Sequence, residues 1–212
     1  MSTLTMNCRL VVGALLVGLA ASCSPPPPPS AETAALEGSL LTVAEVGDSF
    51  VVESRGEVGL SGGGVCPESD FGFDDVGVVR ASFVWSVDGD EVSVIEMLRA
   101  VEPGELEVLF PELRAAYEAC DGVVWTDYGD TQTVGLVTGP DVGDDQIAVR
   151  ARHGDPPFDG RHDNIRIVYV RSGNTFAEIS VSEALENAED STSVSDAEFS
   201  RIVDEAIAKL TG

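Results

Sequence analysis

Two stretches of the chain place apolar residues three and four positions apart, the spacing of one helix face. In the first, this face consists of Leu106, Leu109, Phe110, Leu113, Tyr117 and Cys120. Pro111 lies within it, so the helix is either kinked there or begins there. In the second, Ser195 and Glu198 have the spacing of a capping box. The apolar stripe behind this box predicts an amphipathic helix that closes the chain; it consists of Phe199, Ile202, Val203, Ala206, Ile207 and Leu210.

Other stretches are rich in β-branched and aromatic residues, which favour strands. Residues 76–87 and 91–101 flank Asp88-Gly89-Asp90, whose Asp-Gly pair accepts the positive φ of a tight turn, so they predict a hairpin. Further strands are expected at about residues 133–137, 146–152, 165–171 and 175–182, and Ser172-Gly173-Asn174 joins the last two. Residues 40–46 predict a short helical turn that Thr42 caps. Strands outnumber helices and tight turns join them, so we predict a single α+β domain, an antiparallel β-sheet with packed helices.

The first 22 residues have the pattern of a signal peptide. Arg9 supplies a positive charge, residues 10–21 form an apolar run, and small residues precede Cys23. The apolar run is too short to span a bilayer, which takes roughly 20 residues. A cysteine at this position is typical of an exported bacterial lipoprotein, in which an acyl chain such as palmitate on Cys23 anchors the protein to the outer side of the cell membrane. The alternative is plain secretion.

A proline run follows this cysteine. Residues 25–29 are all proline and favour an extended polyproline conformation. We therefore expect residues 23–38 to be a tether and residues 39–212 to be one extracytoplasmic domain. The run could instead be a ligand for a proline-reading domain, but a tether explains it without a partner.

The chain is strongly acidic. Its 37 acidic and 12 basic residues give a formal charge of −25. Removal of residues 1–22 takes away only Arg9 and leaves −26. Such a surface repels nucleic acid and anionic lipid headgroups, so a nucleic-acid partner is excluded and the lipid must hold the protein to the membrane. The dominance of Ala, Val, Gly and Asp and the single lysine, Lys209, are typical of a GC-rich, for example actinobacterial, genome.

Two of the four cysteines remain for pairing. Cys8 leaves with the signal peptide and Cys23 carries the lipid, so Cys66 and Cys120 are left in an oxidising compartment. A disulfide between them closes a loop of about 55 residues and contributes roughly 4 kcal/mol. The pair lacks the Cys-x-x-Cys spacing of a redox-active site.

A possible nucleophile lies in residues 59–63, Gly-Leu-Ser-Gly-Gly, which fit the Gly-x-Ser-x-Gly pattern of a hydrolase elbow around Ser61. The elbow requires a helix directly after the serine, whereas Cys66-Pro67 follow closely and do not readily start one. The pattern therefore favours a flexible loop over a catalytic serine. In a triad, His153 or His162 would have to serve as the base.

Histidines and aromatic residues supply the other candidate sites. His153 and His162 lie in one polar stretch with three carboxylates, which makes them weak candidates for a transition-metal site; a solvated loop is the simpler interpretation. Trp85, Trp125 and Tyr128 could line an apolar ligand pocket, although aromatic residues in strands more often belong to the core. No cofactor motif is present.

The order of these parts resembles the extracellular sensor domain of certain mycobacterial Ser/Thr protein kinases, a domain that also occurs in free-standing actinobacterial lipoproteins. The resemblance rests on Leu40-Leu41-Thr42-Val43, the helix that ends at Cys120 with Trp125 soon after, Val142-Gly143-Asp144, and Val170-Arg171-Ser172-Gly173-Asn174. It implies an antiparallel sheet with a cleft and a role in ligand sensing. The kinase-attached form has two disulfides, whereas here only Cys66 and Cys120 are available.

These observations predict a membrane-anchored lipoprotein whose non-enzymatic, sensor-like domain binds a small ligand or a cell-envelope partner, with a cleft near Trp85 and Trp125. Two alternatives stay open. One is a serine hydrolase that uses Ser61, and the other is an envelope-structural or interaction lipoprotein without a small-molecule site.

Overall fold

The computed structural model describes residues 31–58, 77–87, 89–122, 124–127, 130–153, 162–185 and 194–211. Within the strands, the side chains of residues 58, 124–127, 130–132, 153, 162–163 and 185 are not part of this description. The elements are α1 Ala31–Ser39, α2 Val43–Val46, β1 Val51–Val58, β2 Val78–Val87, β3 Asp90–Ala100, α3 Glu105–Cys120, β4 Val124–Asp127, β5 Asp130–Val137, β6 Asp145–His153, β7 His162–Ser172, β8 Thr175–Leu185 and α4 Asp196–Thr211.

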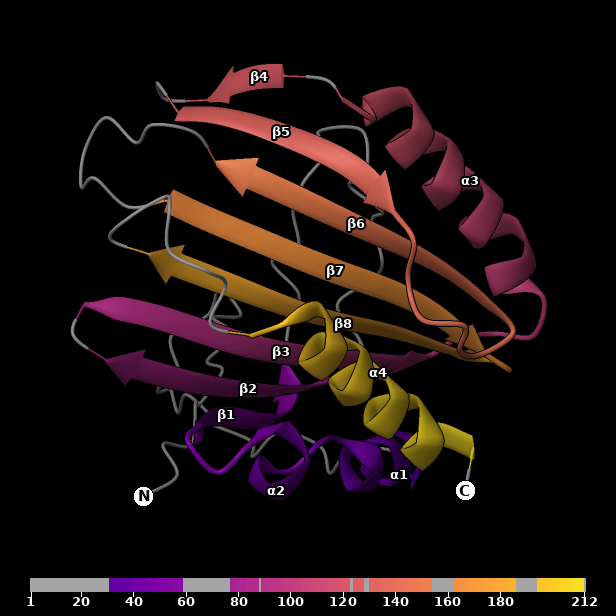
Figure 1. Cartoon of the computed structure of the whole chain (residues 1–212). Coiled ribbons are helices and arrows are strands. Elements are labelled where there is room, and N and C mark those ends of the chain that lie inside the picture. The colour runs from indigo at the N-terminus through magenta and orange to yellow at the C-terminus, as the bar shows by residue number, and fades with distance from the viewer. Residues whose placement is uncertain are drawn as a thin grey trace, which may run out of the picture.

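The eight strands form one antiparallel sheet in the order β1-β2-β3-β8-β7-β6-β5-β4 (Figure 1). The predicted hairpins are confirmed: β2 and β3 pair up to Val87 opposite Asp90, and β7 and β8 meet at Gly173-Asn174, with φ +59° at Gly173. The first and last parts of the chain join in the middle of the sheet, where β3 pairs with β8. The predicted α+β class with an antiparallel sheet is therefore confirmed.

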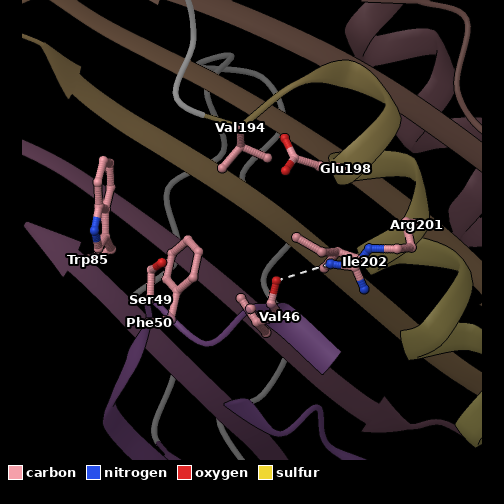
Figure 2. A pocket seen from close by; sticks show the side chains of 9 residues that line it. Val46, Ser49, Phe50, Trp85, Val194, Glu198, Arg201 and Ile202 are labelled. Atoms are coloured by element: carbon pink, nitrogen blue, oxygen red, sulfur yellow. Dashed lines mark hydrogen bonds between the residues drawn. The ribbon is translucent and has the colours of Figure 1, made fainter. Parts of the chain in front are cut away.

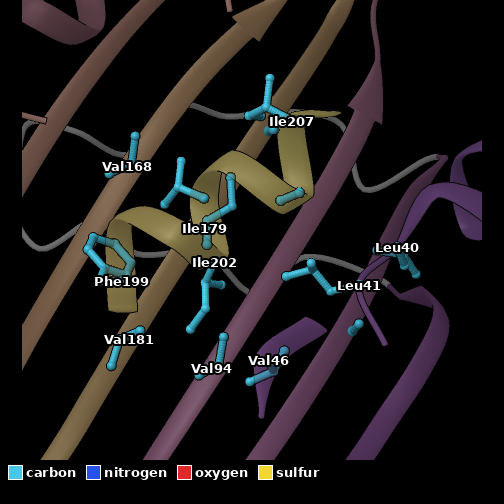
Figure 3. Packing of buried hydrophobic residues seen from close by; sticks show 14 of the residues in the cluster. Leu40, Leu41, Val46, Val94, Val168, Ile179, Val181, Phe199, Ile202 and Ile207 are labelled. Carbon is cyan, nitrogen blue, oxygen red and sulfur yellow. The ribbon is translucent and has the colours of Figure 1, made fainter. Parts of the chain in front are cut away.

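Helices cover both faces of the sheet. Alternate residues of β7 belong to two separate cores: Val168 and Val170 to one, Ile167 and Tyr169 to the other. The first core lies under α1, α2 and α4, a side that we call the α4 face, and Figure 3 shows Phe199, Ile202 and Ile207 of α4 packed over it. The second core lies under α3, on the α3 face. The central strands thus contribute side chains to both cores, as the alternation of a strand requires.

The two predicted helices are confirmed. In α3, Leu106, Phe110, Leu113, Tyr117 and Cys120 are buried, and the helix continues through Pro111 rather than beginning there. Pro111 lies on the exposed face of the helix. The capping box of α4 forms as expected: the Glu198 carboxylate accepts hydrogen bonds from Ser195 N at 2.9 Å and from Ser195 Oγ at 2.7 Å, and Ser195 Oγ accepts one from Glu198 N at 3.2 Å.

The prediction that the tether extends to Gly38 is wrong, because residues 31–39 form the helix α1. Thr33 and Leu36 of this helix are buried, and α1 contacts β2, β3 and α4. The stretch is rich in Ala, Glu and Leu, which are good helix formers, but only Leu36 provides a large apolar anchor, so periodicity did not reveal it. Strands β1 and β4 at the two edges were not predicted either.

A buried carboxylate lies beneath the link between α1 and α2. Glu96 of β3 is fully buried, and its Oε2 accepts the N–H of Leu41 at 2.5 Å. Lys209 donates to the Leu40 carbonyl at 2.8 Å, and Arg55 donates to the carbonyls of Leu40 and Leu41. Burial raises the pKa of Glu96 to about 7, against the opposing effects of the Leu41 hydrogen bond and of the positive charges of Lys209 and Arg55; the negative charge of Glu45 adds to the rise.

Because Glu96 is buried, we predict that the free energy of unfolding falls as the pH rises from 5 to 8. Because the pKa of Glu96 is higher in the folded than in the unfolded chain, the contribution to the free energy of unfolding is greatest below about pH 4.5 and is lost as the pH rises through 7. Desolvation raises the pKa of Glu178 to about 7 and acts in the same direction. Glu96→Gln should reduce the fall by about 1–3 kcal/mol in denaturant unfolding at pH 5, 6, 7 and 8. Glu91→Gln, at an exposed position of the same strand, is the matched control; identical pH profiles for wild type and Glu96→Gln contradict the prediction.

Candidate functional site

A cavity of about 230 Å³ lies on the α4 face, between the turn that follows α2, the end of β2 and the first turns of α4 (Figure 2). Its lining is formed by Val46, Gly47, Ser49, Phe50, Trp85, Val194, Glu198, Arg201 and Ile202. Val46, Val194 and Ile202 are buried, whereas the rings of Phe50 and Trp85 are half-buried. The cavity therefore combines an apolar wall with a partly open aromatic side.

The short helix α2 and the turn after it bring Phe50 to the cavity. Gly47 ends α2 with φ +151°, a conformation that favours glycine, and its N–H donates to the Val43 carbonyl at 2.8 Å. The chain then reverses, and the N–H of Phe50 donates to the Gly47 carbonyl at 3.0 Å. This reversal brings Phe50 to the α4 face, where it packs against the core.

The strand β2 places Trp85 at the same cavity. Trp85 pairs with Val92 of β3, and the side chain of Val92 is fully buried in the core of the α4 face. Directly opposite residues of an antiparallel pair share a face, so Trp85 lies on this face near the end of its strand. Beyond Trp85, Ser86 and Val87 are exposed, which leaves the cavity near the rim of the sheet.

Two charged side chains of α4 complete the lining. Hydrogen bonds from the backbone and the hydroxyl of Ser195 lower the pKa of Glu198, so this carboxylate is charged at neutral pH. Arg201 Nη1 donates to the Glu45 carbonyl at 2.7 Å and Nη2 to the Val46 carbonyl at 3.1 Å. Arg201 thereby satisfies carbonyls that the end of α2 leaves open, and it fixes α2 to α4.

The structure does not bring Trp85 and Trp125 together. Trp85 lies on β2 and Trp125 on β4, six strand positions away across the sheet, which corresponds to about 25–30 Å. The prediction of one cleft near both Trp85 and Trp125 is therefore wrong. Trp85 lines the cavity, the side chain of Trp125 is not described, and Tyr128 lies outside the described residues.

The other predicted site residues lie largely outside the described part. This applies to Cys23, Ser61 and Cys66, so their predicted roles stay predictions. His153 ends β6 and His162 begins β7, so the backbone places both histidines at the same end of two paired strands, although their side chains are not described. Among the described residues, no group of three or more His, Cys, Asp or Glu side chains could hold a metal ion.

Sequence reasoning missed a second cavity and the charged cluster beside it. This cavity, of about 180 Å³, includes Arg150, Arg166, Asp196 and Phe199 in its lining. Asp196 Oδ1 accepts from Arg150 at 2.6 Å and from Arg166 at 3.1 Å, and the guanidinium of Arg166 lies 5.2 Å from the centre of the Phe199 ring. Arg166 is buried and also donates to Glu183 and to the Val194 carbonyl. These bonds hold the start of α4 against β6 and β7, so we assign the cluster a structural role.

Phe50 and Arg201 were missed as well. A short turn around Gly47 precedes Phe50. The glycine was the only feature of the sequence that indicated the chain reversal there. No local sequence pattern identified Arg201 as a lining residue, because the backbone carbonyls that it binds lie 155 and 156 positions away in the chain.

The chain shares its fold with a known extracellular domain. The crystal structure of the extracellular domain of PknH from Mycobacterium tuberculosis matches with a TM-score of 0.56 and 13% sequence identity, over 87% of this chain and 98% of that chain. The X-ray structure of an uncharacterised protein, the Rv0999 ortholog from Mycobacterium smegmatis, gives a TM-score of 0.49 and 13% identity, over 86% of this chain and 96% of that chain. The fold implied by the resemblance to mycobacterial extracellular domains is confirmed by the first match.

Comparison of the sequence with models of known protein families and with curated proteins gives no match. Within the described residues, no helix is both long enough and apolar enough to cross a membrane.

The contacts of Arg201 predict that this side chain holds α2 against α4 and so maintains the shape of the cavity. Arg201→Met retains most of the aliphatic stem but removes both hydrogen bonds to α2, which should lower the free energy of unfolding by about 1–3 kcal/mol. Trp85 should become more exposed to water, so its emission should shift to longer wavelength when it is the sole tryptophan, in a Trp125→Phe background. Arg114→Met is the matched control, since Arg114 of α3 binds Asp145 and the Gln146 carbonyl away from the cavity. An equal shift in both variants contradicts the assignment.

Proposed function

We propose that this protein is an extracytoplasmic lipoprotein, anchored through Cys23, whose single sensor-like domain binds a small ligand without catalysing a reaction. The observation that carries the proposal is the aromatic-lined cavity at Trp85, in a domain that shares its fold with the extracellular domain of PknH. The ligand is bound on the outer side of the cell membrane, in the groove between α2, β2 and α4.

The composition of the cavity supports binding rather than catalysis. Five of the lining side chains are apolar and bring two aromatic rings, the common composition of small-molecule sites. The polar side chains are Ser49, Glu198 and Arg201. Glu198 and Arg201 are engaged in the helix cap and in the carbonyls of α2, and among the described lining residues no histidine, lysine or cysteine stands beside Ser49 as a base or nucleophile. The cavity can thus hold a molecule, but it offers no reacting pair.

The location is supported by the N-terminal sequence and by the fold. The signal-like segment and Cys23 precede α1 by a short stretch, residues 24–30, that contains the five prolines. Seven residues reach no more than about 25 Å even when fully extended. The proposed lipid therefore keeps α1 and the cavity close to the membrane surface, while the acidic domain itself is repelled by anionic headgroups.

We also propose the Cys66–Cys120 disulfide as a staple of this domain. Cys120 is buried at the end of α3, where it packs in the core of the α3 face. The bond would tie the segment between β1 and β2 to α3, across the sheet from the cavity.

The binding function predicts that some small apolar compounds raise the melting temperature of the protein, and that Trp85→Ala abolishes this rise. A ligand at 100 times its dissociation constant stabilises a protein by about 2.7 kcal/mol, which is easily measured as a thermal shift. Val108→Ala, at an exposed position of α3, is the control and should retain the shift. Failure of a broad compound set to stabilise the wild type, or an undiminished shift in Trp85→Ala, would count against a ligand site here.

The anchor predicts a change of cell fraction. In a bacterial host with lipoprotein processing, the wild type should be recovered with membranes and should incorporate labelled palmitate, whereas Cys23→Ala should do neither. Cys66→Ala is the matched cysteine control and should remain membrane-bound. Recovery of Cys23→Ala with membranes to the same extent as the wild type would exclude the proposed anchor.

A further inference from the structure

We infer that the ligand group held in the Trp85 cavity is a single apolar ring that carries a positive charge, and that Glu198 selects it. This inference rests on the proposed function and adds the chemical class of the ligand. It follows from the size of the cavity, from the arrangement of its aromatic and charged side chains, and from the charge of the whole domain.

The size of the cavity limits the ligand. Its volume of about 230 Å³ lies below the range of roughly 300–1,000 Å³ that is usual for sites of drug-sized ligands. Its closed side is formed by Val46, Val194 and Ile202, which are all buried and apolar. Such a space suits one ring system of indole size and excludes an extended lipid chain or an oligosaccharide.

The side chains are arranged on two sides of this space. Figure 2 shows Phe50 and Trp85 on one side and Glu198 and Arg201, which project from α4, on the other. Aromatic faces attract cations, with a gain of about 0.5–2 kcal/mol that is largest for tryptophan. A ring that stacks on Trp85 or Phe50 can therefore place a cationic substituent between the aromatic side and the Glu198 carboxylate.

Glu198 is the side chain that can receive the charge. Its Oε2 already accepts two hydrogen bonds from Ser195, but within the described part of the chain Oε1 makes none. The carboxylate stays ionised because the same Ser195 bonds lower its pKa. An ammonium group at Oε1 would thus gain a charge-assisted hydrogen bond without disturbing the helix cap.

Arg201 does not offer an equivalent site for an anion. Both of its terminal nitrogens donate to carbonyls of α2, at 2.7 and 3.1 Å, so they are engaged with the end of that helix, and its positive charge also acts on Glu198 and lowers the pKa of that carboxyl. The formal charge of −25 further raises the local concentration of cations and lowers that of anions around the domain. Both effects favour a cationic ligand over a carboxylate or phosphate of the same shape.

The test uses three indoles that share a two-carbon chain at position 3 and differ in its end group: an ammonium in tryptamine, no polar group in 3-ethylindole and a carboxylate in indole-3-propionate. Binding to the mature chain in detergent is measured by isothermal titration calorimetry. We expect tryptamine to bind at least tenfold more tightly than indole-3-propionate, with 3-ethylindole between them. Glu198→Gln, which keeps the glutamine form of the capping box, should weaken tryptamine binding about tenfold and leave 3-ethylindole binding within a factor of two. Glu205→Gln, which removes the same charge at an exposed position of α4 outside the cavity, should leave all three affinities nearly unchanged.

Three results would overturn the inference. Equal or tighter binding of indole-3-propionate would remove the preference for cations. Equal effects of Glu198→Gln and Glu205→Gln would assign the preference to the field of the domain rather than to Glu198. Absence of binding by all three compounds at millimolar concentration would exclude the ring class, while the thermal-shift series with Trp85→Ala would still decide independently whether the cavity binds any ligand.

Discussion

The antiparallel pairing of β3 with β8 is the interaction on which the rest of this structure depends. It extends from Glu91 opposite Ala184 to Ala100 opposite Thr175, and it joins two parts of the sheet that are otherwise built from local hairpins. Residues so distant in the chain pair only at a considerable cost in loop-closure entropy. Burial offsets this cost, because Val94 and Leu98 of β3 and Ile179 and Val181 of β8 lie in one continuous core beneath α4.

The β3–β8 pairing completes the surface on which α4 packs, and the first turns of α4 form part of the wall of the cavity. It packs on β7 and β8 and contacts both α1 and α2. Arg201 and Lys209 reach from it to the backbone of residues 40–46, so the short helix α2 is held from the side rather than by its own length. Four residues are too few to cover the sheet next to the first turns of α4. The uncovered space remains as the cavity, with Phe50 and Trp85 on its partly open side.

Local sequence patterns predicted the helices and turns whose buried residues recur at a regular spacing. They failed for elements that are buried only by contacts with distant parts of the chain. The stripe of α4 and the Gly173-Asn174 turn were visible because neighbouring residues determine them. The helix α1 was not visible, since its only large apolar anchor, Leu36, is buried by contacts with other elements. The same limit applies to the site: Trp85 was identified as a candidate by its residue type, but it was paired with Trp125 because the strand order, and hence their separation across the sheet, depends on the β3–β8 pairing.

Leu40-Leu41-Thr42-Val43, the first of the stretches on which the resemblance rests, serves the fold and does not identify the ligand. Leu40 and Leu41 are fully buried, and their backbone groups bind Glu96, Arg55 and Lys209. Thr42 caps α2 through Glu45, with hydrogen bonds of 2.6 and 2.8 Å to the carboxylate. All these residues serve the junction between two helices and the sheet, and none of them lines the cavity. A shared fold at 13% identity therefore does not identify a ligand, and the proposed ligand class rests on Phe50, Trp85 and Glu198 rather than on the fold.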